Sequence, residues 1–340
     1  NEIKYLDGDS FKKNLTEGSR PDNPLLIYGY IEILIFLTCS IVSLVLFKFP
    51  DIYSWLSYFV PESVVIQNTV KALLAFALML IPAFLMGATL PTISKYFISD
   101  NTKICSQVGV LYGINTLGAA LGCFLTGFFL VATFGVLQTV LSAAIINLFI
   151  GICAIRIYQE SGGVLKRIRV PRLARFSFKW EGEHNVWLAV SFVCGFTALA
   201  YEVIWSRLLV FSIASTVYSF SMMLGVFLLG IMLGSLLVVT LSRSNLNLRT
   251  VLIFLQAGIG LYVIGSLYNI DQLLSAPWNG YNLQKPIFVF SRYFLDSSAL
   301  MLLPAIGLGM SFPILVKMIS SGCKHIGKET GQIYGVNTLD

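Results

Sequence analysis

Long apolar runs separated by short polar segments are the dominant pattern along this chain. Eight of these runs contain about 20 residues or more, the length that an α-helix needs to cross the hydrocarbon core of a bilayer. Gly and Pro inside such runs are tolerated in a membrane bundle, because neighbouring helices satisfy the freed backbone carbonyls. The pattern predicts an all-α, polytopic transmembrane helical bundle with spans at 25–47, 70–97, 108–134, 136–158, 186–211, 216–241, 250–270 and 294–319.

The composition excludes the other broad classes of protein. Hydrophobic residues make up 56% of the 340 residues and charged residues 12%, whereas a soluble domain is about 25% charged. A disordered chain, a DNA-binding domain and a coiled coil are excluded by the same values. The six cysteines form no C-x-x-C pair, so neither a disulfide framework nor a metal site is predicted. The predicted partner is the lipid bilayer, and no nucleic acid is expected.

The positions of the basic residues predict the orientation. If residues 1–24 are cytoplasmic and the sides alternate, eighteen of the 23 Lys and Arg residues lie on the cytoplasmic side. This bias follows the positive-inside rule and predicts a multi-pass protein of the inner (cytoplasmic) membrane with a cytoplasmic N-terminus. The basic segment 159–185 could bind nucleic acid or anionic lipid. Because this segment is short and flanked by spans, the preferred interpretation is a cytoplasmic linker whose positive charge enforces the topology.

An internal repeat is the most informative feature of the sequence. The segment LIPAFLMGATLPTISK (80–95) reappears as LLPAIGLGMSFPILVK (302–317), and GVLYGINTL (109–117) reappears as GQIYGVNTL (331–339). Both matches have an offset of 222 residues, and the combined stretch shares 14 identities in 38 positions. Six predicted spans fit within the offset, so the two copies keep the same orientation and are parallel repeats. This arrangement resembles the six-plus-six plan of major-facilitator proteins.

The repeat also predicts how the chain is divided. Counterparts of the spans at 186–211 and 216–241 would precede residue 1, and counterparts of Gly118 onward would follow Asp340. We therefore expect a fragment of a twelve-span domain, with about two spans missing from each end. The expected parts are a cytoplasmic N-terminal segment at 1–24, a four-span block of the first repeat at 25–158, the basic linker at 159–185, and a second repeat truncated at its fifth span at 186–340.

Several motifs resemble those of one protein family. They are FTALAYEVIWSRLL (196–209), STVYSF (215–220), GVFLLGIMLGS (225–235), MGATLP (86–91) and LYGINTLGA (111–119). Together they are similar to the multispanning membrane region of the fused spermidine-synthase-like (polyamine aminopropyltransferase-like) membrane proteins. The resemblance implies that the spans precede a soluble Rossmann-like aminopropyltransferase domain. The Gly-rich turn of such a domain does not occur in these 340 residues. Enzyme activity would therefore belong to a soluble domain of the same parent chain.

Two glutamates inside predicted spans are candidate cavity groups, because a charged side chain in a bilayer is costly and usually faces a cavity or a partner. Glu202 could bind a cationic amine, relay a proton, or fix helix packing. We predict that it points into the bundle and accepts a hydrogen bond from another span. Glu32 aligns with Gln256 after a two-residue shift, which suggests that both positions face a cavity. Tyr201 and Trp205 share a helix face next to Glu202.

The other candidate residues are amides and residues that bend or pack helices. Asn115 and its repeat partner Asn337 are cavity candidates, and joining helices is their favoured role. Small-residue pairs at 109/113, 118/122 and 230/234 predict close helix packing. Prolines and glycines in the repeated segment could form gating kinks, as in the broken helices of transporters, or static kinks. These residues are Pro82, Gly87, Pro91, Pro304, Gly309 and Pro313.

Three functions remain open from the sequence. The bundle could have a transport-like role for a small cationic or polyamine-related solute, with Glu202 and Glu32 on one aqueous cavity. It could instead anchor a downstream aminopropyltransferase domain, or hand that domain a substrate. Walker A, H-E-x-x-H and G-x-S-x-G motifs do not occur in the sequence, so no catalytic residue, metal or cofactor is predicted. The preferred prediction is the transport-like membrane domain.

Overall fold

The protein is described by a computed structural model in which the regular structure is helical. Within the described residues the chain forms no strand. Most of the predicted N-terminal segment 1–24 and of the basic linker 159–185 lies outside the described residues. The described residues are 23–161, 182–212, 217–244, 246–268, 286–323 and 325–338.

The helices form two compact units. Unit 1 contains Asn1–Phe97 and Thr133–Phe176, and unit 2 contains Ile98–Ala132 and Ser177–Asp340. Because the first unit is interrupted by the second in sequence, the predicted four-span block at 25–158 does not coincide with one compact unit. The helix that holds the predicted span at 108–134 belongs mainly to unit 2 instead.

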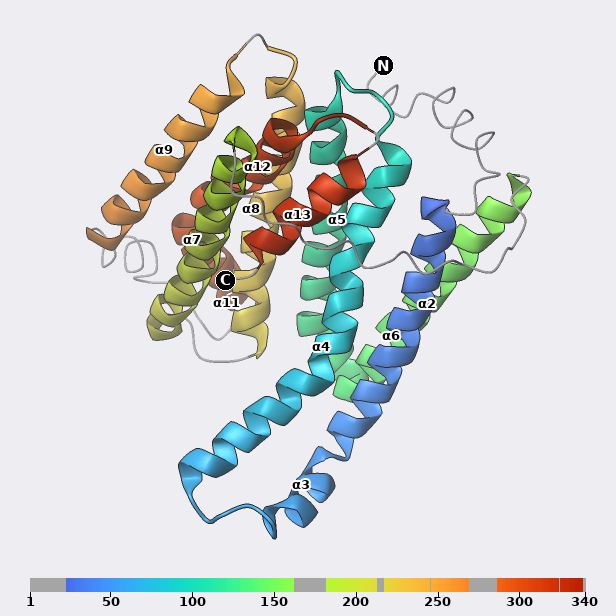
Figure 1. Cartoon of the computed structure of the whole chain (residues 1–340). Coiled ribbons are helices and arrows are strands. Elements are labelled where there is room, and N and C mark those ends of the chain that lie inside the picture. The colour runs from blue at the N-terminus through green and yellow to red at the C-terminus, as the bar shows by residue number, and fades with distance from the viewer. Residues whose placement is uncertain are drawn as a thin grey trace. The chain divides into compact units, whose positions relative to one another are not determined.

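Unit 1 is built from long helices and the short helix α3 (Figure 1). Helix α2 begins where the Asn23 side chain accepts a hydrogen bond of 2.9 Å from the Leu25 backbone N–H. Pro24 fits the first turn, where a missing N–H costs no hydrogen bond. Gly29 of α2 lies against α6, since a Cβ at this position would be 3.0 Å from the Gly151 carbonyl oxygen. The helices are α2 (Pro24–Phe47), α3 (Phe49–Ser57), α4 (Val64–Phe97) and most of α6 (Val131–Glu160).

Unit 2 is organised around α8, which packs most extensively on α5 and α12 (Figure 1). Two short π-helical turns, η1 and η2, continue directly from α5 and into α12. The elements are α5 (Ile104–Leu125), η1 (Thr126–Leu130), α7 (Glu183–Ser212), α8 (Val217–Leu241), α9 (Leu248–Tyr268), α11 (Pro286–Ser297), η2 (Ser298–Leu302), α12 (Leu303–Ile319) and α13 (Ile326–Asn337).

Small residues bring α8 and α12 into backbone contact. A Cβ at Gly234 would collide with the Ile306 carbonyl, and a Cβ at Gly309 would collide with the Ile231 backbone. The Ser235 hydroxyl also reaches the Gly309 carbonyl oxygen at 3.2 Å across this contact. Close packing is therefore confirmed for the pair at 230/234.

The small-residue pair at 118/122 differs from the other two. A Cβ at Gly109 would lie 2.7 Å from the Ser235 carbonyl oxygen, and one at Gly113 would lie 3.0 Å from the Leu236 side chain. At Gly118 and Gly122, a Cβ would have no described atom within 4 Å. Close packing is therefore not found for this pair within unit 2, and it stays a prediction.

Seven helical segments in the described residues are long and apolar enough to span a bilayer, compared with the eight spans predicted. The difference arises at 104–160, which forms a single helical stretch of 57 residues. Gly135 interrupts this stretch with φ 77° and ψ 173°, a conformation that is accessible essentially only to glycine. The two predicted spans at 108–134 and 136–158 lie on either side of this glycine.

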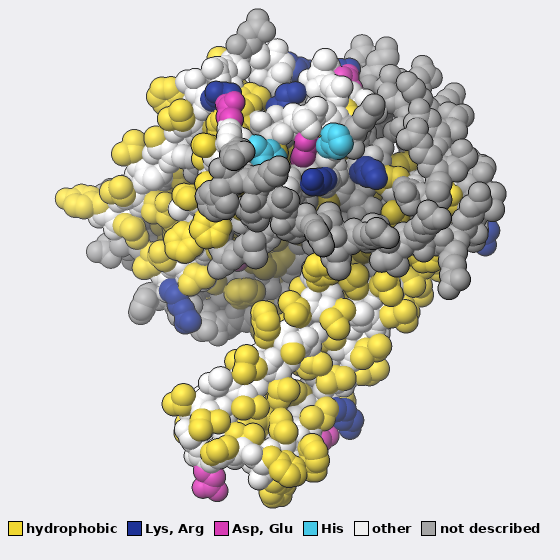
Figure 2. All heavy atoms as spheres, in the orientation of Figure 1, with side chains coloured by type: hydrophobic (Ala, Val, Ile, Leu, Met, Phe, Trp, Pro, Cys, Tyr) yellow, Lys and Arg dark blue, Asp and Glu magenta, His cyan; other side chains and the backbone are white. Residues whose placement is uncertain are grey.

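The helices present apolar side chains outward, as lipid contact requires. On α9, Phe254 is 72% exposed and Leu261 is 71% exposed; on α4, Phe84 is 70% exposed. In the space-filling view, hydrophobic side chains cover most of the visible surface of α3 and the first half of α4 (Figure 2). Large apolar surfaces of this kind would be unfavourable in water. The chain is therefore a multi-pass membrane protein in contact with the lipid bilayer.

Candidate functional site

Unit 2 contains a cavity of about 140 Å³ between five helices. The wall combines one carboxylate, several hydroxyl and amide groups, and aromatic rings, contributed by α5, α7, α8, α12 and the end of α13. The lining residues are Tyr112, Cys194, Gly195, Ala198, Leu199, Glu202, Phe227, Ile231, Leu308, Ser311, Phe312, Leu315, Asn337 and Thr338.

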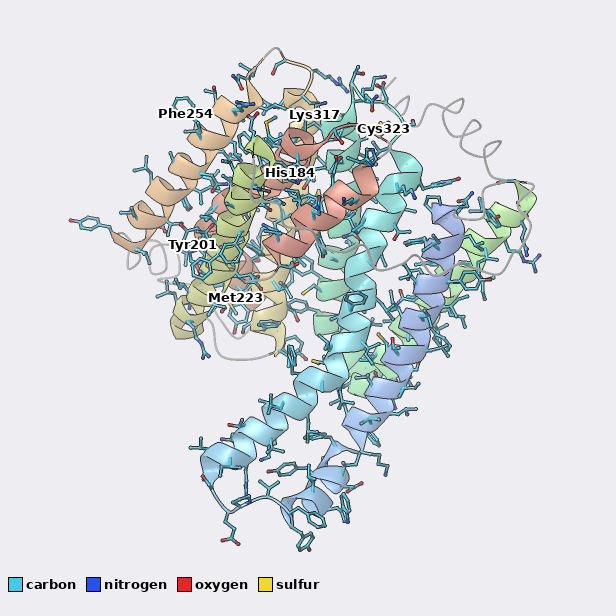
Figure 3. The ribbon with its side chains drawn as sticks, in the orientation of Figure 1. His184, Tyr201, Met223, Phe254, Lys317 and Cys323 are labelled. Atoms are coloured by element: carbon cyan, nitrogen blue, oxygen red, sulfur yellow. The ribbon has the colours of Figure 1, made fainter. Side chains whose placement is uncertain are left out.

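A larger hollow of about 560 Å³ at the start of α9 is a poorer candidate. It is lined by residues of one short segment, including Leu246 and Phe254, and it contains no titratable side chain. Phe254 lies on the outer side of α9, away from the other helices of unit 2 (Figure 3). We attribute this hollow to the lipid-facing surface.

Glu202 supplies the carboxylate of the cavity wall. It lies on α7 and is half-buried. Among the described residues, none donates a hydrogen bond to this carboxylate, so the donor predicted from another span is not found there. The neighbouring Ser206 hydroxyl donates instead to the Val203 carbonyl oxygen at 2.9 Å. A carboxylate at a cavity without a protein partner is available to a ligand.

Ser311 forms part of the wall on α12 and is held by two hydrogen bonds. Its hydroxyl donates to the Gly307 carbonyl oxygen at 3.1 Å, and it accepts from the Gln256 side-chain amide at 2.9 Å. The bond from Gln256 joins α9 to α12. Gln256 therefore lies behind the wall and positions Ser311, although the sequence predicted that Gln256 itself faces a cavity.

Asn337 lines the cavity near the end of α13. Its amide nitrogen donates to the Ser191 carbonyl oxygen of α7 at 3.0 Å, the helix-joining role expected of an amide in a span. Its repeat partner Asn115 is exposed on α5. The α7 residue that Asn337 contacts has its expected counterpart before residue 1, so a symmetric contact of Asn115 stays a prediction.

Tyr201 and Trp205 support the wall from one side. Their rings stack with centroids 5.2 Å apart, and Figure 3 shows Tyr201 on α7. Trp205 is fully buried, and it packs edge-on against Phe227 at 6.5 Å. Because Phe227 lines the cavity and Trp205 does not, Trp205 belongs to the hydrophobic core that holds this part of the wall.

The sequence reasoning missed an aromatic group at the cavity. The Phe312 ring lies 4.5 Å from the Tyr112 ring and 6.0 Å from the Tyr334 ring. The two tyrosines stand 222 residues apart, at the same position in the two copies of the predicted repeat. Their recurrence was therefore a usable signal for Tyr112, while Phe312 and Ser311 stand in an apolar run that gives no such signal.

Glu32 lies elsewhere in the fold. It belongs to α2 of unit 1 and is 5% exposed. The cavity that Glu202 lines is formed by residues of unit 2. A cavity shared by the two glutamates stays a prediction.

The predicted kink residues have different surroundings. Pro82 and Pro91 lie inside α4, and Pro313 lies inside α12, without a break in either helix. Pro304 follows η2 directly and lies inside the continuous helical stretch 286–319. Gly87 is only partly buried, whereas Gly309 packs against α8. Within the described residues, no group of three or more His, Cys, Asp or Glu side chains could hold a metal ion.

Two loops meet at the end of unit 2 where α12 ends and α5 begins. The Asn101 side-chain oxygen accepts a hydrogen bond of 2.7 Å from the Cys323 backbone N–H. The Lys317 ammonium donates to the Asn101 carbonyl oxygen at 3.2 Å, and Figure 3 shows Lys317 and Cys323 at this same end. Burial and the charge of Asp100 raise the pKa of the Cys323 thiol. Hydrogen bonds from Thr102 hold the pKa of Asp100 below its ordinary value.

Comparisons with known proteins do not identify a relative: no family model, curated protein or solved structure matches the chain. The resemblance to spermidine-synthase-like membrane regions therefore stays a prediction. The function is inferred from the cavity and its chemistry.

Proposed function

We propose that this membrane domain binds a small cationic solute in the cavity at Glu202 and moves it by a transport-like mechanism. The observation that supports this most directly is the Glu202 carboxylate on the cavity wall, with no hydrogen bond from any described residue. A half-buried carboxylate in a membrane span is stabilised by a cation that enters the cavity. The aromatic rings of Phe227 and Phe312 on the same wall would attract a cation as well.

The size of the cavity limits the solute. About 140 Å³ is the space of roughly five water molecules at ~30 Å³ each. Drug-sized ligands occupy pockets of about 300–1,000 Å³. The proposed solute is therefore a small cation, such as the aminoalkyl group of a polyamine-related compound, and a whole long polyamine would extend beyond the cavity.

The helix boundaries support the predicted six-plus-six repeat, an arrangement known from transporters. Helix α4 covers Val64–Phe97, and a shift of 222 residues gives 286–319, the continuous stretch from the start of α11 to the end of α12. The same shift carries the first residue of α5, Ile104, onto the first residue of α13, Ile326. Parallel repeats of this kind are typical of transporters whose substrate site lies between the copies.

The loop contact at Asn101 fits a gate. Asn101 and Cys323 are 222 residues apart, so the hydrogen bond joins equivalent positions of the two repeat copies. In transporters built from repeats, the copies move relative to each other around the site. The bond would then have to break when the cavity opens at this end, which is the cytoplasmic end if the positive-inside rule holds.

The proposed ligand class is tested with three probes of similar size and different charge. The purified chain in detergent is titrated with butylammonium, butan-1-ol and butyrate, and binding is measured by calorimetry. We expect butylammonium to bind at least tenfold more tightly than the neutral alcohol and butyrate to show no binding, because the wall carries a carboxylate. Binding of none of the three, or equal binding of all three, would contradict the proposal and favour a membrane anchor for a downstream aminopropyltransferase domain.

The gate is tested by the reactivity of Cys323 in a variant that retains it as the single cysteine. Asn101→Ala removes the acceptor of one hydrogen bond, worth about 1 kcal/mol, so we expect the open form to increase severalfold. Opening relieves the burial that raises the pKa of the thiol, and maleimide modification near pH 7 should accelerate by a similar factor.

Asn247→Ala is the matched control for this experiment. The Asn247 side chain accepts a hydrogen bond of 3.0 Å from the Arg249 backbone N–H in a different loop. This variant should leave the modification rate of Cys323 unchanged. An Asn101→Ala rate equal to that of the control would show that the loop contact is not a gate.

A further inference from the structure

Two hydroxyl groups of residues on the cavity wall, those of Ser311 and Thr338, donate their hydrogen atoms to the protein backbone. The Ser311 hydroxyl donates to the Gly307 carbonyl oxygen at 3.1 Å and accepts from Gln256. The Thr338 hydroxyl donates to the Tyr334 carbonyl oxygen at 2.6 Å. A hydroxyl has one hydrogen atom, so each of these groups can offer a ligand only a lone pair.

The other polar groups add to this acceptor character. The Asn337 amide nitrogen faces the Ser191 carbonyl oxygen at 3.0 Å, and since a carbonyl can only accept, the orientation of the amide is fixed. Its own oxygen remains available as an acceptor. An ionised Glu202 carboxylate accepts hydrogen bonds and donates none. Tyr112, which also lines the cavity, has a hydroxyl that can donate or accept.

A wall of this composition distinguishes between cations of the same charge. A primary ammonium group carries three N–H donors and no acceptor, which complements the wall. A quaternary ammonium ion has the same charge and is equally attracted by aromatic rings, but it leaves each acceptor that it covers without a hydrogen bond. The N–H donors of the ligand should therefore discriminate between the two ions, whereas the charge and the aromatic rings do not.

We propose that the cavity is a site for a short primary alkylamine in its ammonium form. The N–H groups of the ammonium ion would donate hydrogen bonds to the side-chain oxygens of Glu202, Ser311 and Thr338. The inference rests on the proposed function, since it requires that the cavity takes a cation. The cavity volume of about 140 Å³ corresponds to roughly five water molecules at ~30 Å³ each, which favours a cation with few non-hydrogen atoms.

The test compares two isomeric cations, butylammonium and tetramethylammonium, which have the same atoms and the same charge. The purified chain in detergent is titrated with each by calorimetry. We expect butylammonium to bind at least tenfold more tightly. If both bind with equal affinity, the cation site stands and the inference is overturned. If neither binds, the proposed function itself fails.

Variants that lack one hydroxyl group test whether the cavity wall causes the preference for butylammonium over tetramethylammonium. Ser311→Ala should weaken butylammonium binding severalfold and leave tetramethylammonium binding unchanged, so that the ratio of the two affinities falls. Thr338→Val, which keeps the shape of the side chain, should act in the same direction and provides a second test if Ser311→Ala does not fold. Ser266→Ala is the matched control, because Ser266 is a buried serine of α9 that donates to the Val263 carbonyl oxygen and does not line the cavity. A ratio that stays constant in both wall variants would overturn the inference.

Discussion

Glu202→Gln is expected to lower the affinity of the chain for butylammonium by at least tenfold while the protein stays folded and inserted. The substitution keeps the size of the side chain and removes its negative charge, and the new amide adds an N–H donor that repels an ammonium ion. Loss of one partner from a desolvated charge pair costs about 2–5 kcal/mol, and every 1.4 kcal/mol is a factor of ten in affinity. The measurement is calorimetric titration of the wild type and the variant in the same detergent.

Glu183→Gln is the control for this experiment. Glu183 lies on the same helix, but its side chain is 61% exposed and pairs with Arg249 at the end of α7. An exposed pair of this kind contributes about 0–1 kcal/mol to stability, and the substitution should leave butylammonium binding unchanged. A Glu202→Gln variant that binds normally, with only a shift in melting temperature worth ~1 kcal/mol, would assign Glu202 to helix packing.

Gly234→Ala is expected to separate α8 from α12 and to lower the thermal stability of the chain. The added methyl group would collide with the Ile306 carbonyl and would lie 3.0 Å from the Met310 backbone nitrogen, and a backbone cannot move aside as a flexible side chain can. Overpacking of this kind costs about 1–3 kcal/mol. Because Ile231 on α8 and Leu308 on α12 both line the cavity, butylammonium affinity should fall together with the melting temperature.

Gly258→Ala gives the matched comparison. Gly258 is also inside a helix, and a Cβ at this position has no described atom within 4 Å. Alanine is favoured over glycine in a helix by about 1 kcal/mol, so this variant should be as stable as the wild type or more stable. Equal melting temperatures for Gly234→Ala and Gly258→Ala would show that α8 and α12 are not in the close contact described.

The sequence by itself determined where long apolar helices lie in this protein. The prediction at 216–241 corresponds to α8 at Val217–Leu241, and the prediction at 25–47 corresponds to α2 at Pro24–Phe47. These helices are predictable because the length of an apolar run and the polar residues that end it are local properties of the chain. The limit of this reasoning is visible at Gly135, where a backbone conformation, not a polar segment, divides a helical stretch of 57 residues.

Only the tertiary structure decided which side chains form the cavity. Glu202 was found from the sequence because a carboxylate in an apolar run is conspicuous, but Ser311 and Phe312 were not, and Asn115 is exposed although its partner Asn337 lines the wall. In a soluble helix, the division into apolar and polar faces shows which side is buried. A membrane span is apolar on all sides, so its sequence contains little information about which face meets another helix and which meets lipid. That choice depends on packing between helices far apart in the chain, such as α5, α8 and α12.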